Sequence, residues 1–235
     1  MPMLDKTQRC VYSNGMTTAS TLNDPRVASA LDRMFAEAKL DNAIRARLKA
    51  IWPDGFAAAT PQEQADAKAQ VYMPISAQGG RLLYNLIRAA RPATVVEFGT
   101  SFGISTLYLA AAVCDNGTGH VFTTELSATK AEAARQTFTE TGLDDLITVL
   151  EGDARETLSR LAGPVDFVLL DGWKDLCLPV LRIVEPRLAP GTLVVADDVE
   201  LTDLQPYLDY VRDPHNGYQS VTFPVEDGME ISCRL

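Results

Sequence analysis

Residues 94–103 have the sequence TVVEFGTSFG, in which a β-branched run ends in an acidic residue and a pair of glycines. Val95 and Val96 predict a buried strand, and Gly99 and Gly103 are typical of the tight turn from a parallel strand into a helix. In open α/β sheets, ligands bind outside the carboxyl ends of the strands. The segment therefore predicts an α/β fold with a binding site beside Glu97.

The alternation of strand and helix continues through most of the chain. Further apolar runs are HVFTTEL (120–126), ITVLEGD (147–153), VDFVLLD (165–171) and GTLVVADD (191–198), with helical patterns over 103–115, 128–141, 155–162 and 174–189. Continuous apolar strands are buried on both faces, which predicts a doubly wound, Rossmann-like, mostly parallel sheet. Runs 219–225 and 229–235 predict a C-terminal antiparallel hairpin, which makes seven strands.

The front of the chain is predicted to be helical. Asp24-Pro25 has the form of an N-cap followed by proline at the first helical position, and apolar residues follow at helical spacing: Val27, Leu31, Met34 and Phe35. Helices are expected over 25–39 and 41–51, after roughly 15 residues that are either a flexible leader or the product of an upstream start. We divide the chain into an N-terminal helical extension, 1–60, and an α/β domain, 61–235. We expect a homodimer, because these apolar residues lie outside a sheet that is already covered.

Composition narrows the possible partners. The 235 residues carry 31 Asp and Glu against 21 Lys and Arg, a formal net charge of −10. Such a charge disfavours nucleic acid and anionic membranes and suits a small neutral or cationic ligand or a metal ion. No apolar run approaches the ~20 residues of a membrane helix, and the N-terminus has no hydrophobic signal core. The cysteines show no zinc-site or disulfide-framework spacing, so we expect a cytoplasmic protein.

The strand ends carry acidic residues suited to a nucleoside cofactor. A nicotinamide site normally has GxGxxG, whereas here Glu97 precedes a single glycine pair and could hold a cationic group such as an ammonium. This favours S-adenosylmethionine over a dinucleotide. Glu125 ends the second strand, where a carboxylate can accept both ribose hydroxyls or cap the next helix. Asp153, in Gly152-Asp153-Ala154, could bind an adenine amino group.

Two further strand ends place three carboxylates together. Asp171 follows the fourth strand, and Asp197 and Asp198 follow the fifth. Oxygen ligands in this number suit Mg²⁺ or another divalent cation such as Ca²⁺, because without a cation they would repel one another. The alternative is that Asp171 and Asp198 cap loops and that no metal binds.

Residues 72–235 resemble the catechol O-methyltransferase family, on the segment DFVLLDGWKD (166–175) followed by Leu178-Pro179. The resemblance implies that residues 61–235 form a methyltransferase domain, which moves a methyl group from S-adenosylmethionine to a hydroxyl of a catechol-like aromatic small molecule. It also implies roles for single residues: Ile75, Glu97, Gly99, Gly103 and Ser105 around the methionine part, Glu125 on the ribose, Trp173 on the adenine, and Asp171, Asp197 and Asp198 on Mg²⁺. From their places at strand ends, Asp153, Ala154 and Asp171 are also expected to border the cofactor. Lys174 would be the general base, and Glu230 would accept a hydrogen bond from the second hydroxyl.

The chain departs from that family at a pair of positions. Asp198 stands where these enzymes usually carry asparagine, and Gly172 stands where the animal enzymes carry histidine. The first adds a negative charge, which should tighten cation binding, and the second is expected to open space near the cofactor. Residues 1–60 match no motif of the family. A metal-independent methyltransferase and a non-catalytic cofactor-binding protein remain alternatives.

Overall fold

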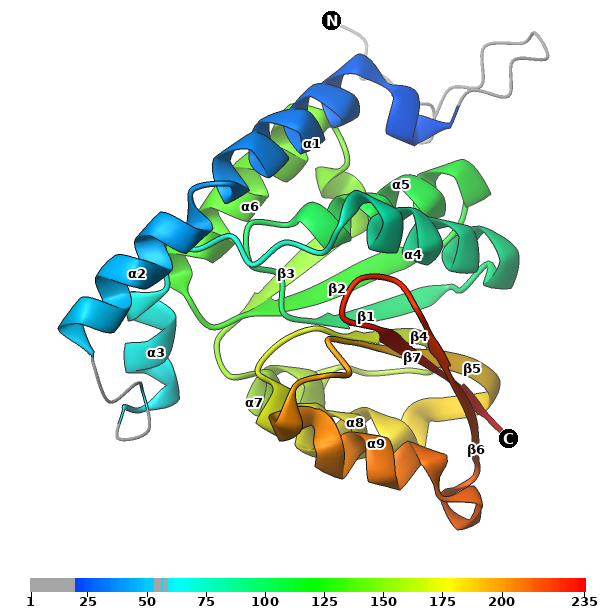
Figure 1. Ribbon diagram of the computed structural model, residues 1–235. Coiled ribbons are helices and arrows are strands. Elements are labelled where there is room, and N and C mark those ends of the chain that lie inside the picture. Colours follow the sequence, from blue (N-terminus) through cyan, green and yellow to red (C-terminus); the bar gives the residue numbers. More distant parts are fainter. Residues whose placement is uncertain (1–19, 53–55, 57–58) are drawn as a thin grey trace, which may run out of the picture.

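The computed structural model describes residues 20–52, 56 and 59–235, so the predicted leader lies outside the described residues. Its centre is one seven-stranded sheet in the order β3-β2-β1-β4-β5-β7-β6 (Figure 1). The strands are β1 (Thr94–Phe98), β2 (His120–Glu125), β3 (Ile147–Glu151), β4 (Val165–Leu170), β5 (Leu188–Asp197), β6 (Tyr218–Phe223) and β7 (Met229–Arg234). The first five are parallel, and β7 runs antiparallel between β5 and β6. The predicted fold class is confirmed.

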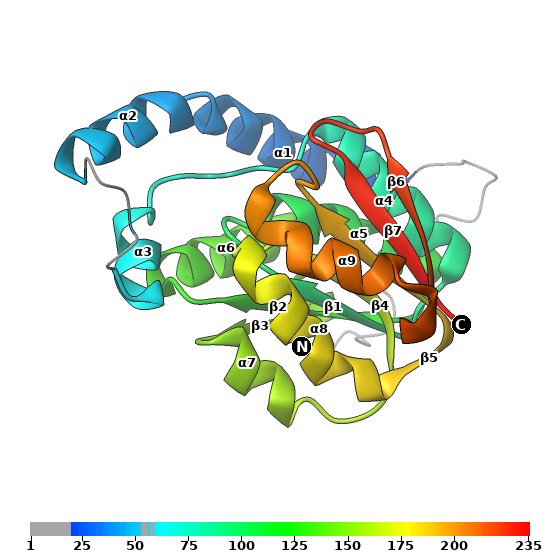
Figure 2. The ribbon, with the colours of Figure 1, turned by 60° about the horizontal axis from the view of Figure 1, so that its bottom comes forward.

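Helices cover both faces of the sheet, as Figure 2 also shows. One face carries α4 (Ala77–Ala90), α5 (Ile104–Asn116) and α6 (Ala128–Thr141); the other carries α7 (Ala154–Thr157), α8 (Cys177–Val184) and α9 (Gln205–Arg212). Successive residues of a strand point to opposite faces, so Val95 belongs to the first core and Val96 to the second. Hydroxyl N-caps at Ser76 and Ser127 begin α4 and α6, and left-handed Gly142 ends α6.

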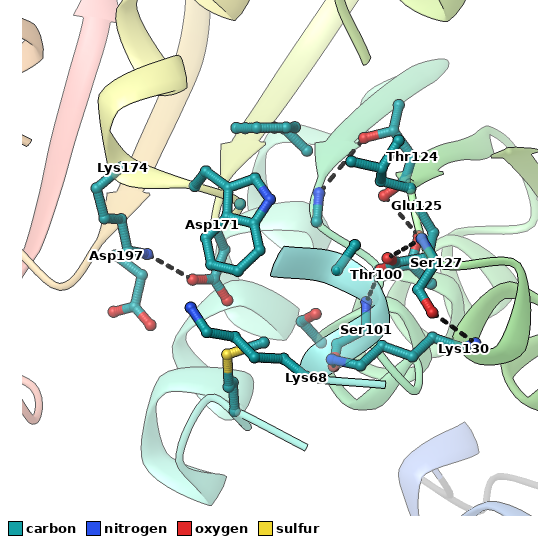
Figure 3. Close-up of a pocket in the computed structure, with 18 of the residues that line it drawn as sticks. Lys68, Thr100, Ser101, Thr124, Glu125, Ser127, Lys130, Asp171, Lys174 and Asp197 are labelled. Atoms are coloured by element: carbon teal, nitrogen blue, oxygen red, sulfur yellow. Dashed lines mark hydrogen bonds and ion pairs between the residues drawn. The ribbon is translucent and has the colours of Figure 1, made fainter. Parts of the chain in front are cut away.

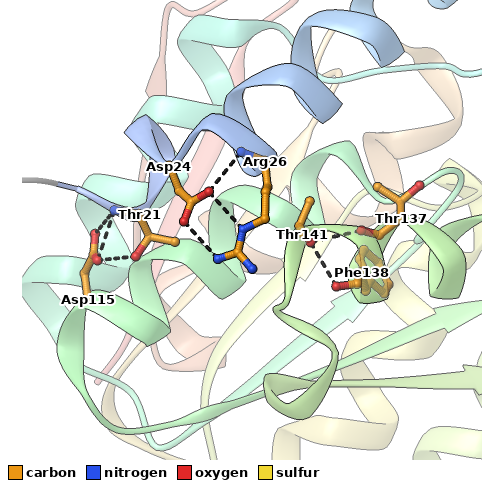
Figure 4. Close-up of polar contacts among 7 residues, drawn as sticks. All are labelled: Thr21, Asp24, Arg26, Asp115, Thr137, Phe138 and Thr141. Carbon is orange, nitrogen blue, oxygen red and sulfur yellow. Dashed lines mark hydrogen bonds and ion pairs between the residues drawn. The ribbon is translucent and has the colours of Figure 1, made fainter. Parts of the chain in front are cut away.

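The extension consists of α1 (Pro25–Ala38), α2 (Asp41–Ile51) and α3 (Pro61–Ala67). Asp24 caps α1 through the backbone N–H of Arg26, and Thr21 bonds to Asp115 of α5 (Figure 4). The apolar side of α1 is buried in the core that lies over α5 and α6: Val27, Ala30, Leu31 and Met34. This corrects the argument for a homodimer, because those side chains pack within the chain. It also means that residue 60 does not separate two cores.

Some elements differ from the predicted ones. The predicted helix at 155–162 is one turn of α-helix followed by a 3-10 turn at Leu158–Arg160, and α9 and α4 were not anticipated as separate helices. Within the described residues, no helix has the length and hydropathy needed to cross a membrane.

Candidate active site

A cavity of about 450 Å³ opens where β1 to β5 end, at the carboxyl edge of the sheet (Figure 3). Its volume is typical of a small-molecule site. Most of the residues predicted from the sequence line it: Ile75, Gly99, Ser105, Glu125, Asp153, Ala154, Asp171, Trp173, Lys174, Asp197 and Asp198. Glu97, Gly103 and Glu230 do not belong to its lining.

Glu97 precedes the lining residues Phe98 and Gly99 in the chain and is fully buried. Thr106 donates a hydrogen bond to its Oε2 at 2.5 Å, whereas its Oε1 makes no hydrogen bond of good geometry with any described residue. Burial raises the pKa of Glu97 to about 7, although the neighbouring hydroxyls of Ser105, Thr106 and Thr123 oppose the shift. A buried carboxylate oxygen without a donor is costly, and a bound ammonium group would satisfy it.

The glycines of the site serve the packing of the protein itself. A Cβ on Gly99 would lie 2.6 Å from the carbonyl oxygen of Asp171, and one on Gly103 would lie 2.6 Å from the ring of Phe138. Both also have positive φ. Gly172 was expected to leave open space near the cofactor, and this is wrong: a Cβ there would lie 2.5 Å from the Phe98 ring, which fills that space.

Glu125 is held in one orientation at the edge of the cavity. Its Oε2 accepts the backbone N–H of Ser101 at 2.7 Å, and its Oε1 accepts that of Ser127 at 2.8 Å. Burial raises its pKa, and these backbone donors oppose the shift. The carboxylate of Asp153 already has partners within the protein, because it caps α7 and forms an ion pair with the guanidinium of Arg155.

The three aspartates meet as predicted. Asp171, Asp197 and Asp198 each offer a carboxylate oxygen within 4.8 Å of the others. Lys174 Nζ lies 2.8 Å from Asp171 Oδ1 and 3.0 Å from Asp198 Oδ2, so the lysine compensates part of their charge. Burial and the other two carboxylates raise the pKa of Asp197 to about 8. Burial alone would lower the pKa of Lys174, but the neighbouring carboxylates raise it above its ordinary value.

The structure contradicts the expected role of Glu230. Its side chain is 1% exposed and points away from the cavity toward α9, where Arg212 donates to both carboxylate oxygens at 2.8 Å. Thr222 donates a further hydrogen bond at 2.6 Å. The preceding residue, Met229, faces α4 and the side chain of Ile75 instead, since neighbours in a strand point to opposite faces. Glu230 therefore stabilises the last strands and does not reach a ligand.

Residues of the extension contribute to the site, and sequence reasoning missed them. Asp41, at the start of α2, accepts the backbone N–H groups of Tyr72 at 2.8 Å and Met73 at 2.7 Å. These bonds support Met73 in a left-handed conformation, with φ of 48°. Ser101 ties the same segment to the loop after β1 by donating to the Tyr72 carbonyl at 2.6 Å. The turn-forming Tyr72-Met73-Pro74 was visible in the sequence, but nothing there pointed to Asp41.

Three cations also line the cavity: Arg45, Lys68 and Lys130. Lys130 donates to Ser101 Oγ at 3.1 Å, and burial lowers its pKa to about 8. Lys68 lies with its Nζ 4.2 Å from the centre of the Trp173 ring. No pattern in the sequence distinguished these lysines from surface ones, because their position depends on how α2, α3 and α6 pack.

Comparison with known proteins agrees with this geometry. A family model described as a methyltransferase domain matches residues 96–199. A probable O-methyltransferase of Mycobacterium tuberculosis is 32% identical over 84% of this chain and 83% of its own length. Catechol O-methyltransferase B of Danio rerio is 30% identical over 69% of this chain and 66% of its own length.

Solved structures agree as well. The structure of an O-methyltransferase from Bacillus cereus in complex with S-adenosylhomocysteine superposes with a TM-score of 0.62 over 86% of this chain and all of that one, at 19% identity. That likeness concerns the fold, whereas the relationship to the mycobacterial protein extends over most of both sequences. The chain belongs to the S-adenosylmethionine-dependent O-methyltransferases.

Proposed function

We propose that this enzyme transfers the methyl group of S-adenosylmethionine to one hydroxyl of a vicinal aromatic diol and uses a divalent cation to hold that diol. The observation that carries the proposal is the set of Asp171, Asp197 and Asp198, gathered at one end of the cavity with Lys174 between two of them. The catechol O-methyltransferases among the relatives support the same substrate class.

The cofactor fits the other end of the proposed site. The unpartnered Oε1 of Glu97 would accept the ammonium group of the methionine part, with Ile75, Ser105 and the backbone at Gly99 around it. Glu125 would accept the ribose hydroxyls through lone pairs that its two backbone donors leave free. Trp173 would border the adenine. Gly103 would contribute through packing of the loop, and Asp153 and Ala154 would close the far side.

The donor set suits a hard divalent cation such as Mg²⁺, because three carboxylate oxygens lie within coordinating reach of one another. When bound, the cation would neutralise these carboxylates and lower the pKa of the hydroxyls and of Lys174. Lys174 Nζ is then the group placed to take the proton of the attacking hydroxyl. Backbone hydrogen bonds tie Asp171 to Phe98 and Glu125 to the loops at Ser101 and Ser127, and this support would help to align the hydroxyl oxygen with the methyl group.

A metal-independent methyltransferase is the second candidate, and a specific contact favours it. Lys174 already neutralises part of the aspartate cluster through its two ion pairs, so the cluster does not depend on a metal to exist. In that case a substrate with a single hydroxyl would suffice.

The two candidates are separated by turnover of catechol and of phenol with and without a chelator, followed by mass analysis of the product. We expect turnover of catechol to vanish in chelator and return with Mg²⁺. Asp171→Ala and Asp197→Ala should prevent that rescue and leave S-adenosylhomocysteine affinity nearly unchanged, whereas Asp198→Asn should stay active. Lys174→Ala should lower turnover and spare metal binding. Undiminished methylation of phenol in chelator would refute the metal-dependent mechanism.

A further inference from the structure

A second cavity, of about 290 Å³, adjoins the active-site cavity and is lined by residues between positions 45 and 71. The two share Arg45 and Lys68 in their linings. Leu48 and Lys49 of α2 and Trp52 after it line the cavity on the same side as Arg45, because side chains at positions i, i+3, i+4 and i+7 of a helix lie on one side. The two cavities are therefore neighbours that share part of a wall.

The cations around this second cavity have no carboxylate partner among the residues that the structure describes. Within the described part of the chain, no carboxylate lies within ion-pair distance of Arg45, Lys49 or Lys68, although the protein has a net charge of −10. Lys68 is half-buried, and its Nζ lies 4.8 Å from the centre of the Phe56 ring and 4.2 Å from the centre of the Trp173 ring. Burial and the charge of Arg45 lower its pKa. A half-buried cation in this setting is stabilised when an anion binds beside it.

The remaining walls are apolar. Leu48, Trp52, Phe56 and Val71 line the cavity beside the cations, and the rings of Trp52 and Phe56 lie 5.2 Å apart. A ligand that fills this space must carry both an apolar segment and a negative charge.

Lys68 stands at the junction of the two cavities. Its Nζ lies over Trp173, and the next residue in the chain, Lys174, contacts Asp171 and Asp198. In Figure 3 the Lys68 side chain extends into the active-site cavity on the side where Asp171 and Asp197 lie. A molecule held at the aspartates could therefore reach Lys68 with a short substituent.

We propose that the second cavity binds an anionic tail of the methyl acceptor, a carboxylate on a short apolar arm attached to the aromatic diol. Lys68 and Arg45 would bind the carboxylate, and the apolar walls would contact the arm. The inference rests on the proposed function in one respect, since that function places the diol at the aspartate cluster. A positively charged tail is disfavoured by the same cations.

The test compares ligands that differ only in the charge of the tail: 3-(3,4-dihydroxyphenyl)propanoate and its primary amide. Calorimetry with the S-adenosylhomocysteine-bound protein measures affinity for each, and turnover with S-adenosylmethionine and Mg²⁺ measures kcat/KM. We expect the carboxylate to bind about tenfold or more tightly than the amide, as a charge-assisted hydrogen bond provides. Lys68→Glu should abolish or reverse this preference, whereas the exposed Lys39→Glu, which changes the net charge equally, should retain it.

The outcomes separate the two proposals. Tighter binding of the carboxylate ligand without turnover would support anion binding in the second cavity and refute methylation of the diol. Turnover of both ligands without a preference for the carboxylate would overturn anion binding in the second cavity and leave the proposed function standing. Lys68→Glu could also lower the affinity for S-adenosylhomocysteine. If that loss were as large as the loss of affinity for the carboxylate ligand, Lys68 would belong to the cofactor site, and the proposed role of the second cavity would be overturned.

Discussion

Replacing Glu97 with glutamine should make the protein more stable at alkaline pH and weaken cofactor binding. The carboxylate is fully buried, its Oε1 has no donor among the described residues, and burial raises its pKa to about 7 from an ordinary value of 4.5. The folded protein therefore keeps a proton at Glu97 that the unfolded chain loses above pH 4.5. The stability of the wild type falls as the pH rises through this window and stays low above pH 7, whereas the variant lacks this contribution.

The size of the effect follows from the pKa difference. A pKa difference of this size between the folded and unfolded states lowers the unfolding free energy of the wild type by about 3 kcal/mol at pH 8 and by less than about 1 kcal/mol at pH 5. The advantage of Glu97→Gln over the wild type should therefore grow by about 2 kcal/mol between these pH values, or roughly 5 °C in Tm for a chain of this size. A pH-independent effect of the new amide on the unfolding free energy does not change this difference, because it shifts the variant equally at every pH.

Thermal unfolding of both proteins at a series of pH values, without ligand, measures the slopes. Glu132→Gln is the control, because Glu132 is exposed and its substitution changes the charge equally. Calorimetric titration with S-adenosylhomocysteine should show affinity about tenfold or more lower in Glu97→Gln, because the ammonium group loses a charged acceptor. Parallel stability curves for the variant and the wild type would refute the buried-charge reasoning, and unchanged affinity would remove Glu97 from the cofactor site.

Two further predictions concern packing and ion pairing near the site. Gly172→Ala should cost about 1–3 kcal/mol in unfolding free energy by displacing the Phe98 ring, and a double-mutant cycle with Phe98→Leu should recover part of it; additive effects would contradict the contact. Arg212→Ala should lower the unfolding free energy by about 2 kcal/mol, because the buried Glu230 carboxylate would keep only the hydrogen bond from Thr222. Water should replace part of the lost interaction, since the Arg212 guanidinium is half-exposed. The exposed ion pair between Arg135 and Glu151 provides the comparison. Urea titration of both variants should show that Arg135→Ala lowers the unfolding free energy by less than about 1 kcal/mol.

The sequence by itself determined the sheet and the acidic part of the site. Short β-branched apolar runs such as 165–171, alternating with helical segments, favour central parallel strands, and the carboxyl ends of parallel strands meet at one edge. For that reason Asp171 and Asp197, far apart in sequence, could be placed together before the fold was known, and the structure brings them within 4.8 Å. The turn at Gly99 was predictable for the same reason, although the contact that requires glycine there was not.

Only the tertiary structure decided the remaining features, because they depend on which distant side chains approach. The alternation within β7 required Met229 and Glu230 to face opposite sides, but only the packing of α9 with Arg212 showed that Glu230 faces away from the cavity. Likewise, the ring of Phe98 fills the space beside Gly172. The cations of the second cavity meet because α2 lies beside the segment at Lys68, an arrangement that no local pattern encodes.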